Sequence, residues 1–291
     1  MSKILITGAT GSLGGQVINE LLKKEGDFQI VAMGRDLSKL EGYQSKGIEV
    51  RQGDYDDFES LEKAFQGIDK LYFVSGSDIG NRLVQHENVV KAAKSANVQH
   101  VVYTSFERKN ETDSSPLAAV AAGHLRAEAL LKESGLSYTF LRHNLYMDLL
   151  PMFIGENVLE QGMIYLPAGQ GKTSFVLRAE MAAASAAVLT TSGHEHKEYK
   201  ISAPETHSFE EFAVILSELS GKDIKYISPS TEEFQKTLHD LGVPEPVIGI
   251  TTGFALGIAE DDLDVASDDI EKLTGSKPTD VKTFLTSVYK K

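Results

Sequence analysis

The sequence predicts an α/β fold: a doubly wound parallel sheet with a smaller C-terminal α/β lobe. Short β-rich runs alternate with helical patterns of ten or more residues from the start of the chain, and most of these runs carry apolar residues on both faces. Strands of this kind, separated by helices, form parallel sheets that helices cover on both faces. The alternation loosens after about residue 144, which predicts the second lobe.

The elements of the first half follow a regular order. Strands are expected over 3–8, 28–34, 48–54, 69–76, 100–106 and 136–142. Helices are expected over 13–26, from Leu37, and over 58–67, 80–98 and 117–135. Right-handed crossovers between parallel strands place such helices on both faces of the sheet.

The second half mixes turns, helices and short strands. We expect a helix near 149–161, turns at 165–174, an Ala-rich helix over 178–191 and a strand at 198–202. Capping boxes at Ser208 with Glu211 and at Ser230 with Glu233 open two more helices around a strand at 222–228, and 275–289 is a turn and a closing helix. One or two late strands are predicted to return to the main sheet.

Composition excludes several classes of protein. The chain has 291 residues, 41% hydrophobic and 24% charged, which is an ordinary globular balance. It contains no Cys, so disulfides, thiolate metal sites and Cys nucleophiles are excluded. No apolar run approaches the roughly 18 residues of a membrane span. A net charge of -13 without a basic patch argues against nucleic acid, and we expect a cytoplasmic protein.

The strongest motif is "ITGATGSLGG". Gly8, Gly11 and Gly14 follow a strand and open a helix, so the backbone can approach a pyrophosphate that faces the helix N-terminus. The alternative is a glycine-rich turn in an α/β fold without a ligand. With the strand-helix units around it, the motif predicts a Rossmann-type NAD(P)-binding domain over 1–145 and a substrate-binding lobe over 146–291. The residues of this loop expected to contact the cofactor are Gly8, Thr10, Gly11, Ser12, Leu13 and Gly14.

The end of the second strand predicts which cofactor binds. An acidic residue there would bind a ribose 2′-hydroxyl, whereas Arg accommodates a 2′-phosphate. Position 34 is Gly and position 35 is Arg, which favours NADPH, with NADH still possible. The alternative is that Arg35 is a solvated loop cation and that Asp36 binds the ribose.

Other candidate cofactor contacts end later strands. Asp54 ends the third strand, where it could accept a hydrogen bond from the adenine amino group, and Thr104 lies at the end of the fifth. These positions share the carboxyl edge of the sheet, where ligands of such folds bind. Each also fits a plain strand cap or turn. The fourth strand ends in Val74, Ser75 and Gly76.

Three further patterns are weaker. "AGQGKTS" lacks the first glycine of a phosphate loop, since position 166 is Leu, so we expect a turn. His194 and His196 have near-metal spacing but no third ligand, and no metal is expected. The acidic run from Glu260 to Glu271 is interpreted as a solvated face with helix caps.

The motifs "TGATGSLGG", "GRD", "GDYDD", "VKAAKSANVQHVVYTS" and "YTFLRHNLYMD" resemble the NmrA-like group of atypical short-chain dehydrogenase/reductases, with bacterial type-2 NAD(P)H:quinone oxidoreductases nearest. The likeness covers the whole chain. Ordinary members of the superfamily use a Tyr acid and a Lys four residues later. None of the ten tyrosines here has a Lys at that spacing. Counted back from Glu128, the Lys position holds His124 and the Tyr position Val120.

The missing acid limits the substrate. Hydride transfer to a ketone makes a strongly basic alkoxide that needs a positioned acid. A quinone gives a phenolate-like oxygen whose conjugate acid has a pKa of about 10, so a weak donor or water suffices. The resemblance therefore implies NADPH-dependent quinone reduction that depends mainly on holding the two reactants face to face.

Candidate catalytic residues lie in "RHNLY", which leaves the sixth strand. His143 or Tyr146 could donate a hydrogen bond to the quinone oxygen, and Asn144 could bind cofactor or substrate. Core packing is an equal alternative for Tyr146. For His124 we favour pairing with Glu128 at i, i+4 over a contact to the cofactor.

Two functions remain from the sequence. One is an NADPH-dependent quinone reductase, with a small-molecule partner and a possible homodimer. The other is a non-catalytic NADP(H)-sensing regulator, because some NmrA-like proteins bind dinucleotide and a partner protein.

Overall fold

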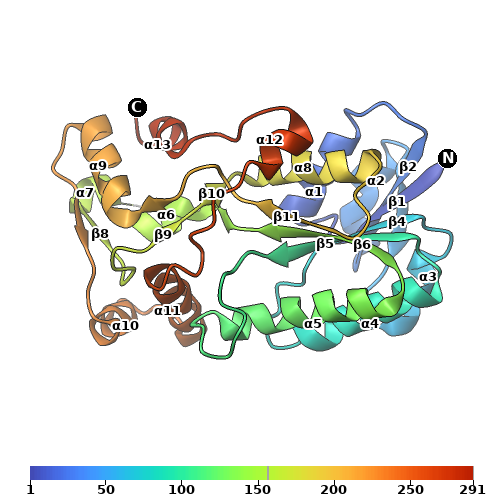
Figure 1. Ribbon diagram of the computed structural model, residues 1–291, viewed down its shortest axis with the longest axis horizontal. Helices are drawn as coiled ribbons and strands as arrows, with labels where there is room; N and C mark the ends of the chain where they lie inside the picture. Colours follow the sequence, from blue (N-terminus) through green and yellow to red (C-terminus); the bar gives the residue numbers. More distant parts are fainter. Residues whose placement is uncertain (156, 291) are drawn as a thin grey trace.

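The computed structural model describes residues 1–155 and 157–290, and its main element is a seven-stranded parallel sheet (Figure 1). Every residue of the strand His100–Phe106 is buried, as expected for a strand with helices on both faces. The spatial order is β11-β6-β5-β4-β1-β2-β3, and the predicted doubly wound parallel sheet is confirmed. The strands are β1 (Ser2–Ile6), β2 (Phe28–Gly34), β3 (Glu49–Gln52), β4 (Lys70–Phe73), β5 (His100–Phe106), β6 (Ser137–His143) and β11 (Lys197–Ile201).

Helices cover both faces of this sheet. They are α1 (Ser12–Leu21), α3 (Phe58–Phe65), α4 (Arg82–Ser95), α5 (Ala118–Ser134), α8 (Arg178–Thr190) and α12 (Asp269–Thr274), with the short η1 (Leu37–Leu40) and α2 (Glu41–Gln44) after β2. One apolar core joins the sheet to α1, α8 and α12, and a second joins it to α3, α4 and α5 (Figure 1).

The strand order reverses beside β1. The chain runs from β1 outward through β2 and β3 and then crosses to β4 on the other side of β1. The crevice at the carboxyl ends of strands next to such a reversal is where ligands of open α/β sheets bind. The topology therefore places a site at the ends of β1, β2 and β4.

A smaller lobe lies at one end of the sheet (Figure 1). Its helices are η2 (Met147–Leu149), α6 (Leu150–Ile154), α7 (Val158–Gln161), α9 (Phe209–Ser220), α10 (Thr231–Asp240), α11 (Glu245–Ala259) and α13 (Val281–Tyr289). Its short strands pair as β7 (Leu145–Tyr146) with β10 (Phe175–Val176), β9 (Lys172–Thr173) with β12 (His207–Ser208), and β8 (Met163–Tyr165) with β13 (Lys225–Ile227). These elements share a third apolar core, rich in Phe.

One strand returns from the lobe to the main sheet among the described residues, and α12 comes back later to cover the same sheet. α8 packs against α1, and β11 then pairs in parallel with β6, with Tyr199 opposite Leu141. The sheet thus contains residues from both halves of the sequence.

The lobe brings one correction and one confirmation. The single helix predicted near 149–161 is wrong: α6 ends at Ile154 because Gly155 adopts a φ of 93°, and α7 begins only at Val158. Both predicted capping boxes are present, as the Ser208 and Ser230 hydroxyls accept from the backbone N–H groups of Glu211 and Glu233.

Candidate active site

The glycine loop between β1 and α1 is shaped by close backbone approach. Gly8 has a φ of 59°, which favours glycine, and its carbonyl accepts from Gly11 N at 2.9 Å. A Cβ at Gly14 would lie 2.4 Å from Gly8 O, so position 14 admits no side chain. α1 has no acidic residue in its first turn, which leaves its N-terminus suited to an anion.

A cavity of about 450 Å³ opens over this loop. It brings together eleven predicted cofactor contacts. They are Gly8, Thr10, Gly11, Ser12, Leu13, Gly14, Arg35, Asp54, Val74, Ser75 and Gly76. The predicted Thr104 and Asn144 do not line it. The ends of four strands therefore form one long pocket, which we call the loop pocket.

Arg35 and Asp36 have separate roles. Arg35 is exposed and lines the loop pocket. The Asp36 carboxylate accepts from the Ser38 backbone N–H at 3.0 Å and from the Ser38 hydroxyl at 2.7 Å, and these bonds hold its pKa below the usual value. Asp36 therefore caps η1, and Arg35 is left as an exposed cation in the lining of the loop pocket.

Tyr55 and Arg178 are among the residues of the loop pocket that were not predicted. The Tyr55 hydroxyl hydrogen-bonds the Thr7 hydroxyl at 2.5 Å and donates to Val74 O at 2.7 Å, which ties the ends of β1 and β4 together. Arg178 begins α8, and its guanidinium lies 5.1 Å from the centre of the Tyr146 ring. No spacing in the sequence links either residue to the glycine loop.

A second cavity, of about 320 Å³, adjoins the first. Both cavities are lined by Val74, Ser75, Gly76, Ser77 and Tyr146, so they share one wall. Apolar side chains from five separate segments of the chain form most of the lining of the second cavity. We call it the acceptor pocket, and its apolar residues include Phe106, Val120, Leu149, Phe153 and Phe254.

His143 is the unusual polar residue of the acceptor pocket. It is only 4% exposed, and neither ring nitrogen has a hydrogen-bond partner among the described residues. Burial lowers its pKa to about 3, so the imidazole is neutral and carries one donor and one acceptor. A buried imidazole without hydrogen-bond partners destabilises the folded protein unless a ligand forms hydrogen bonds with it.

Tyr146 lies in the wall between the two pockets. Burial raises the pKa of its hydroxyl, which keeps the group protonated and able to donate. Its ring centre is 6.5 Å from that of His143. Both predicted catalytic side chains therefore line the acceptor pocket.

Thr104 and Asn144 line the acceptor pocket, but their polar atoms are already engaged. The Thr104 hydroxyl accepts from Ser75 N at 2.8 Å. The Asn144 amide donates to Leu263 O at 3.1 Å, and its oxygen accepts from Leu145 N at 2.9 Å. The two residues fix the strand ends that form the pocket.

The expected pairing of His124 with Glu128 is wrong. His124 Nδ1 lies 2.8 Å from the Tyr103 hydroxyl, and its Nε2 lies 3.3 Å from Arg82 Nη1. Burial first, and then the nearby cation of Arg82, hold the His124 pKa well below its usual value. A neutral His124 gains little from a carboxylate.

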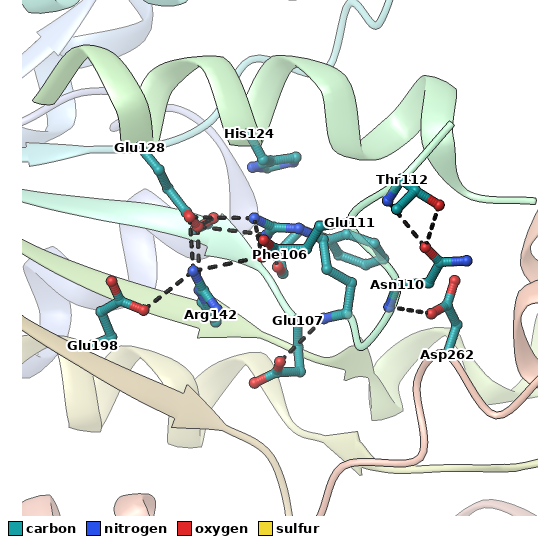
Figure 2. Close-up of polar contacts among 12 residues, drawn as sticks. Phe106, Glu107, Asn110, Glu111, Thr112, His124, Glu128, Arg142, Glu198 and Asp262 are labelled. Atoms are coloured by element: carbon teal, nitrogen blue, oxygen red, sulfur yellow. Dashed lines mark hydrogen bonds and ion pairs between the residues drawn. The ribbon is translucent and has the colours of Figure 1, made fainter. Parts of the chain in front are cut away.

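Glu128 instead joins a buried ion-pair network behind the pocket (Figure 2). Its Oε2 lies 2.8 Å from Arg142 Nη2 and 3.2 Å from Arg108 Nη2, and its Oε1 accepts from the Ser105 hydroxyl at 2.5 Å. Burial alone would raise the Glu128 pKa, but the two cations and Ser105 lower it on balance. The network ties α5 to the ends of β5 and β6.

Two of the weaker motifs make structural contacts, and the interpretation of 260–271 as a solvated face is wrong at Asp262, which is buried and accepts from Asn110 N and the Ser115 hydroxyl. A Cβ at Gly171 would lie 1.8 Å from Ile258 O, so "AGQGKTS" packs tightly against α11. Both ring nitrogens of His194 lie within hydrogen-bond distance of a hydroxyl, at 2.6 Å from Thr191 and 2.7 Å from Tyr199. Within 1–155 and 157–290, no three acidic or His side chains form a metal-binding group.

The fold, the glycine loop and the pocket at the strand reversal define the Rossmann class of dinucleotide-binding α/β proteins. Within that class, the chain belongs to the NmrA-like family, whose model matches residues 1–285.

Solved structures and curated relatives agree with this placement. The chain is 35% identical to quinone oxidoreductase 2 of Escherichia coli, over 98% of both chains. The structure of that enzyme with NADPH superposes with a TM-score of 0.90, covering 98% of this chain and 99% of the other. Triphenylmethane reductase of Citrobacter sp., solved with NADP(H), is 39% identical over 99% of this chain and all of its own, with a TM-score of 0.89. The negative transcriptional regulator NmrA shares the fold at 15% identity, covering 99% of this chain and 96% of its own, with a TM-score of 0.76.

Proposed function

We propose that this protein reduces quinones with NADPH by direct hydride transfer, without a Tyr-Lys pair. The observation that carries the proposal is the shared wall of the two pockets, through Val74 to Ser77 and Tyr146. A dinucleotide on the glycine loop can extend along that wall, and an aromatic acceptor in the second pocket would then face its nicotinamide end. Such apposition is the main requirement of hydride transfer.

The residues of the loop pocket fit NADPH. Gly8, Gly11 and Gly14 leave room for a pyrophosphate at the start of α1, and exposed Arg35 provides a cation for a 2′-phosphate. When bound, NADPH supplies the hydride. The quinone oxidoreductase relative and the triphenylmethane reductase relative are both described with this cofactor, which supports the same choice here.

The residues of the acceptor pocket fit a flat aromatic acceptor. Aromatic side chains of Phe106, Phe153 and Phe254 line it, and His143 and Tyr146 each offer a hydrogen to an acceptor oxygen. Neutral His143 cannot act as a strong acid. The pocket therefore suits an acceptor whose reduced oxygen is only weakly basic, which is the property of a quinone.

The test is an NADPH oxidation assay with benzoquinone and naphthoquinone. We expect quinone-dependent loss of NADPH absorbance that saturates in both substrates. Absence of any rate above background at saturating NADPH would contradict catalysis and would favour the NADP(H)-sensing alternative. The likeness to regulator NmrA shows the fold alone, so nothing here favours that alternative.

A triphenylmethane dye is a second candidate acceptor. The support is the 39% identity to triphenylmethane reductase and the aromatic lining of the acceptor pocket. The same assay with such a dye tests it, through loss of the dye's colour.

The proposed reaction makes a small-molecule substrate the binding partner of this protein, as the similarity to quinone oxidoreductase 2 supports. No helix that the structure describes has both the length and the apolar character of a membrane span. The homodimer and the cytoplasmic location stay predictions from the sequence.

A further inference from the structure

Arg82, at the start of α4, carries a buried charge without a carboxylate partner. It is 8% exposed and lines the acceptor pocket. Its Nε donates to Gly76 O at 2.7 Å, and its Nη1 donates to Val120 O at 3.2 Å and to His124 Nε2 at 3.3 Å. Across the described residues, none of the ion pairs within 4.0 Å includes Arg82.

This arrangement differs from that of two other arginines, buried Arg108 and half-buried Arg142. Arg142 pairs with Glu128 (Figure 2), and Arg108 pairs with the same carboxylate. Burying a guanidinium against neutral acceptors alone costs free energy, and a cation at a helix N-terminus also opposes the helix dipole. Because Arg stays charged inside proteins, an anionic ligand oxygen would provide the close negative charge that Asp78, which is exposed and beyond ion-pair distance, does not.

Helix α5 passes next to the Arg82 side chain and leaves room for it at Gly123. A Cβ at Gly123 of α5 would lie 2.8 Å from Arg82 Cδ and 3.0 Å from its Cγ. A glycine inside a helix costs about 1 kcal/mol relative to alanine. α5 therefore gives up some helix stability at the one point where the arginine side chain passes over it.

The neighbouring histidine is matched to the arginine. A guanidinium can only donate, so His124 Nε2 accepts and its Nδ1 carries the proton toward the Tyr103 hydroxyl. A Lys at position 124, as in ordinary members of the superfamily, would place a second cation against Arg82. The positive charge at this site thus comes from α4 instead of α5.

We propose that Arg82 is a catalytic residue that stabilises the negative oxygen of the reduced acceptor. The proposal rests on the proposed function for the reaction itself. The quinone gains a hydride, which is one hydrogen and two electrons, and its second oxygen becomes an anion beside Arg82. A proton from water then completes the hydroquinone. Arg82 also favours acceptors that become anionic on reduction, such as quinones, over triphenylmethane dyes, which are cations that become neutral.

The first test is binding, without turnover. 4-Nitrophenol imitates the phenol and phenolate forms of a reduced quinone, and its colour reports ionisation. Titrated against pH with NADP⁺-saturated protein, it should bind to the wild type with its pKa lowered by about one unit or more, since an opposite charge within hydrogen-bond distance lowers a pKa by about 1–3 units. Arg82→Met should abolish the shift, and Arg82→Lys should retain part of it.

The second test is kinetic. Arg82→Met should lower kcat/KM for benzoquinone roughly 10- to 100-fold, the value of one hydrogen bond to a charged group, while the Kd of NADPH stays within about twofold. Gly123→Ala should give a smaller loss by displacing Arg82. Arg126→Met removes an exposed arginine of α5 that lines neither pocket, and should change nothing.

Each outcome decides between the two proposals. A wild type that does not bind nitrophenolate, or an Arg82→Met protein with an unchanged shift, overturns the role of Arg82. Equal loss of NADPH binding and turnover would also overturn it and make Arg82 a cofactor residue. If the pKa shift of bound 4-nitrophenol depended on Arg82 but the protein never oxidised NADPH, the anion site would stand and quinone reduction would be wrong.

Discussion

The two pockets recognise their ligands by different means. The loop pocket is formed by glycines, backbone amides and the exposed Arg35 at the ends of β1 to β4. The acceptor pocket is formed by aromatic side chains around the buried cation Arg82 and the unpartnered His143. The loop pocket is suited to hold a charged ligand through its shape and many weak contacts. The acceptor pocket is suited to bind its ligand through a few buried polar groups.

This difference predicts how each pocket responds to substitution. In the loop pocket the backbone segments pack directly against one another, so adding one methyl group should displace the loop. In the acceptor pocket the apolar lining tolerates change, but each polar group acts in a low dielectric, where its effect is larger than in water. Substitutions in the loop pocket should change cofactor affinity, and those in the acceptor pocket should change turnover.

The largest effect is expected for Gly14→Ala. The new Cβ would overlap Gly8 O at 2.4 Å and force the loop away from the phosphate. Losing two charged hydrogen bonds of about 1.5–3 kcal/mol each should weaken NADPH binding by more than roughly 100-fold in a calorimetric titration. Gly249→Ala is the control, since its Cβ would meet nothing within 4 Å. Wild-type affinity in Gly14→Ala would contradict the steric argument.

The next effect concerns cofactor choice. Arg35→Ala should weaken NADPH binding about 10- to 100-fold, the value of one hydrogen bond to a charged group, and leave NADH almost unchanged. Lys39→Ala removes a neighbouring exposed cation that does not line the pocket, and should affect neither. If both cofactors lost affinity equally in Arg35→Ala, the assignment to the 2′-phosphate would be wrong.

Most of the loop pocket could be predicted from the sequence because the predicted residues lie in the glycine loop or at the ends of strands. Gly8, Arg35, Asp54 and Val74 lie far apart in the chain, but parallel strands bring their carboxyl ends to one edge. Recognising the strands was therefore enough to bring these residues together.

The acceptor pocket could not be predicted in the same way. Arg82, Phe153 and Phe254 come from three helices whose relative positions depend on how the lobe packs. No spacing in the sequence connects them. The helix rule that paired His124 with Glu128 failed because Arg108 and Arg142, from other elements, provide full charges that a buried neutral imidazole cannot match.

A smaller effect is expected for His143→Leu, which should raise stability and lower activity. Removing an unpartnered buried imidazole should raise the free energy of unfolding by about 1–3 kcal/mol, the cost of leaving such a group unsatisfied. The same change should lower kcat/KM for quinones by roughly tenfold, the upper value of one neutral hydrogen bond, without changing the Kd of NADPH. Denaturant unfolding and steady-state kinetics measure the two effects. Loss of both stability and activity would show that His143 is a packing residue.

The last expected effect is a dependence of stability on pH that belongs to the acceptor pocket. His143 has a pKa of about 3 in the folded protein, lowered by burial from 6.5, so unfolding takes up a proton once the pH falls below 6.5. Its contribution to stability is complete above pH 6.5 and is lost toward pH 3, at about 1.4 kcal/mol per pH unit. The free energies of unfolding of His143→Leu and His143→Gln should be measured between pH 6 and pH 4. Both should decline less steeply with falling pH than that of the wild type, because each variant takes up about one proton fewer on unfolding. The two variants differ in polarity but share the loss of the titrating group, so a common slope assigns the effect to protonation. A wild-type slope in both would mean that the imidazole becomes protonated without unfolding, and the acceptor pocket would then admit a second positive charge beside Arg82.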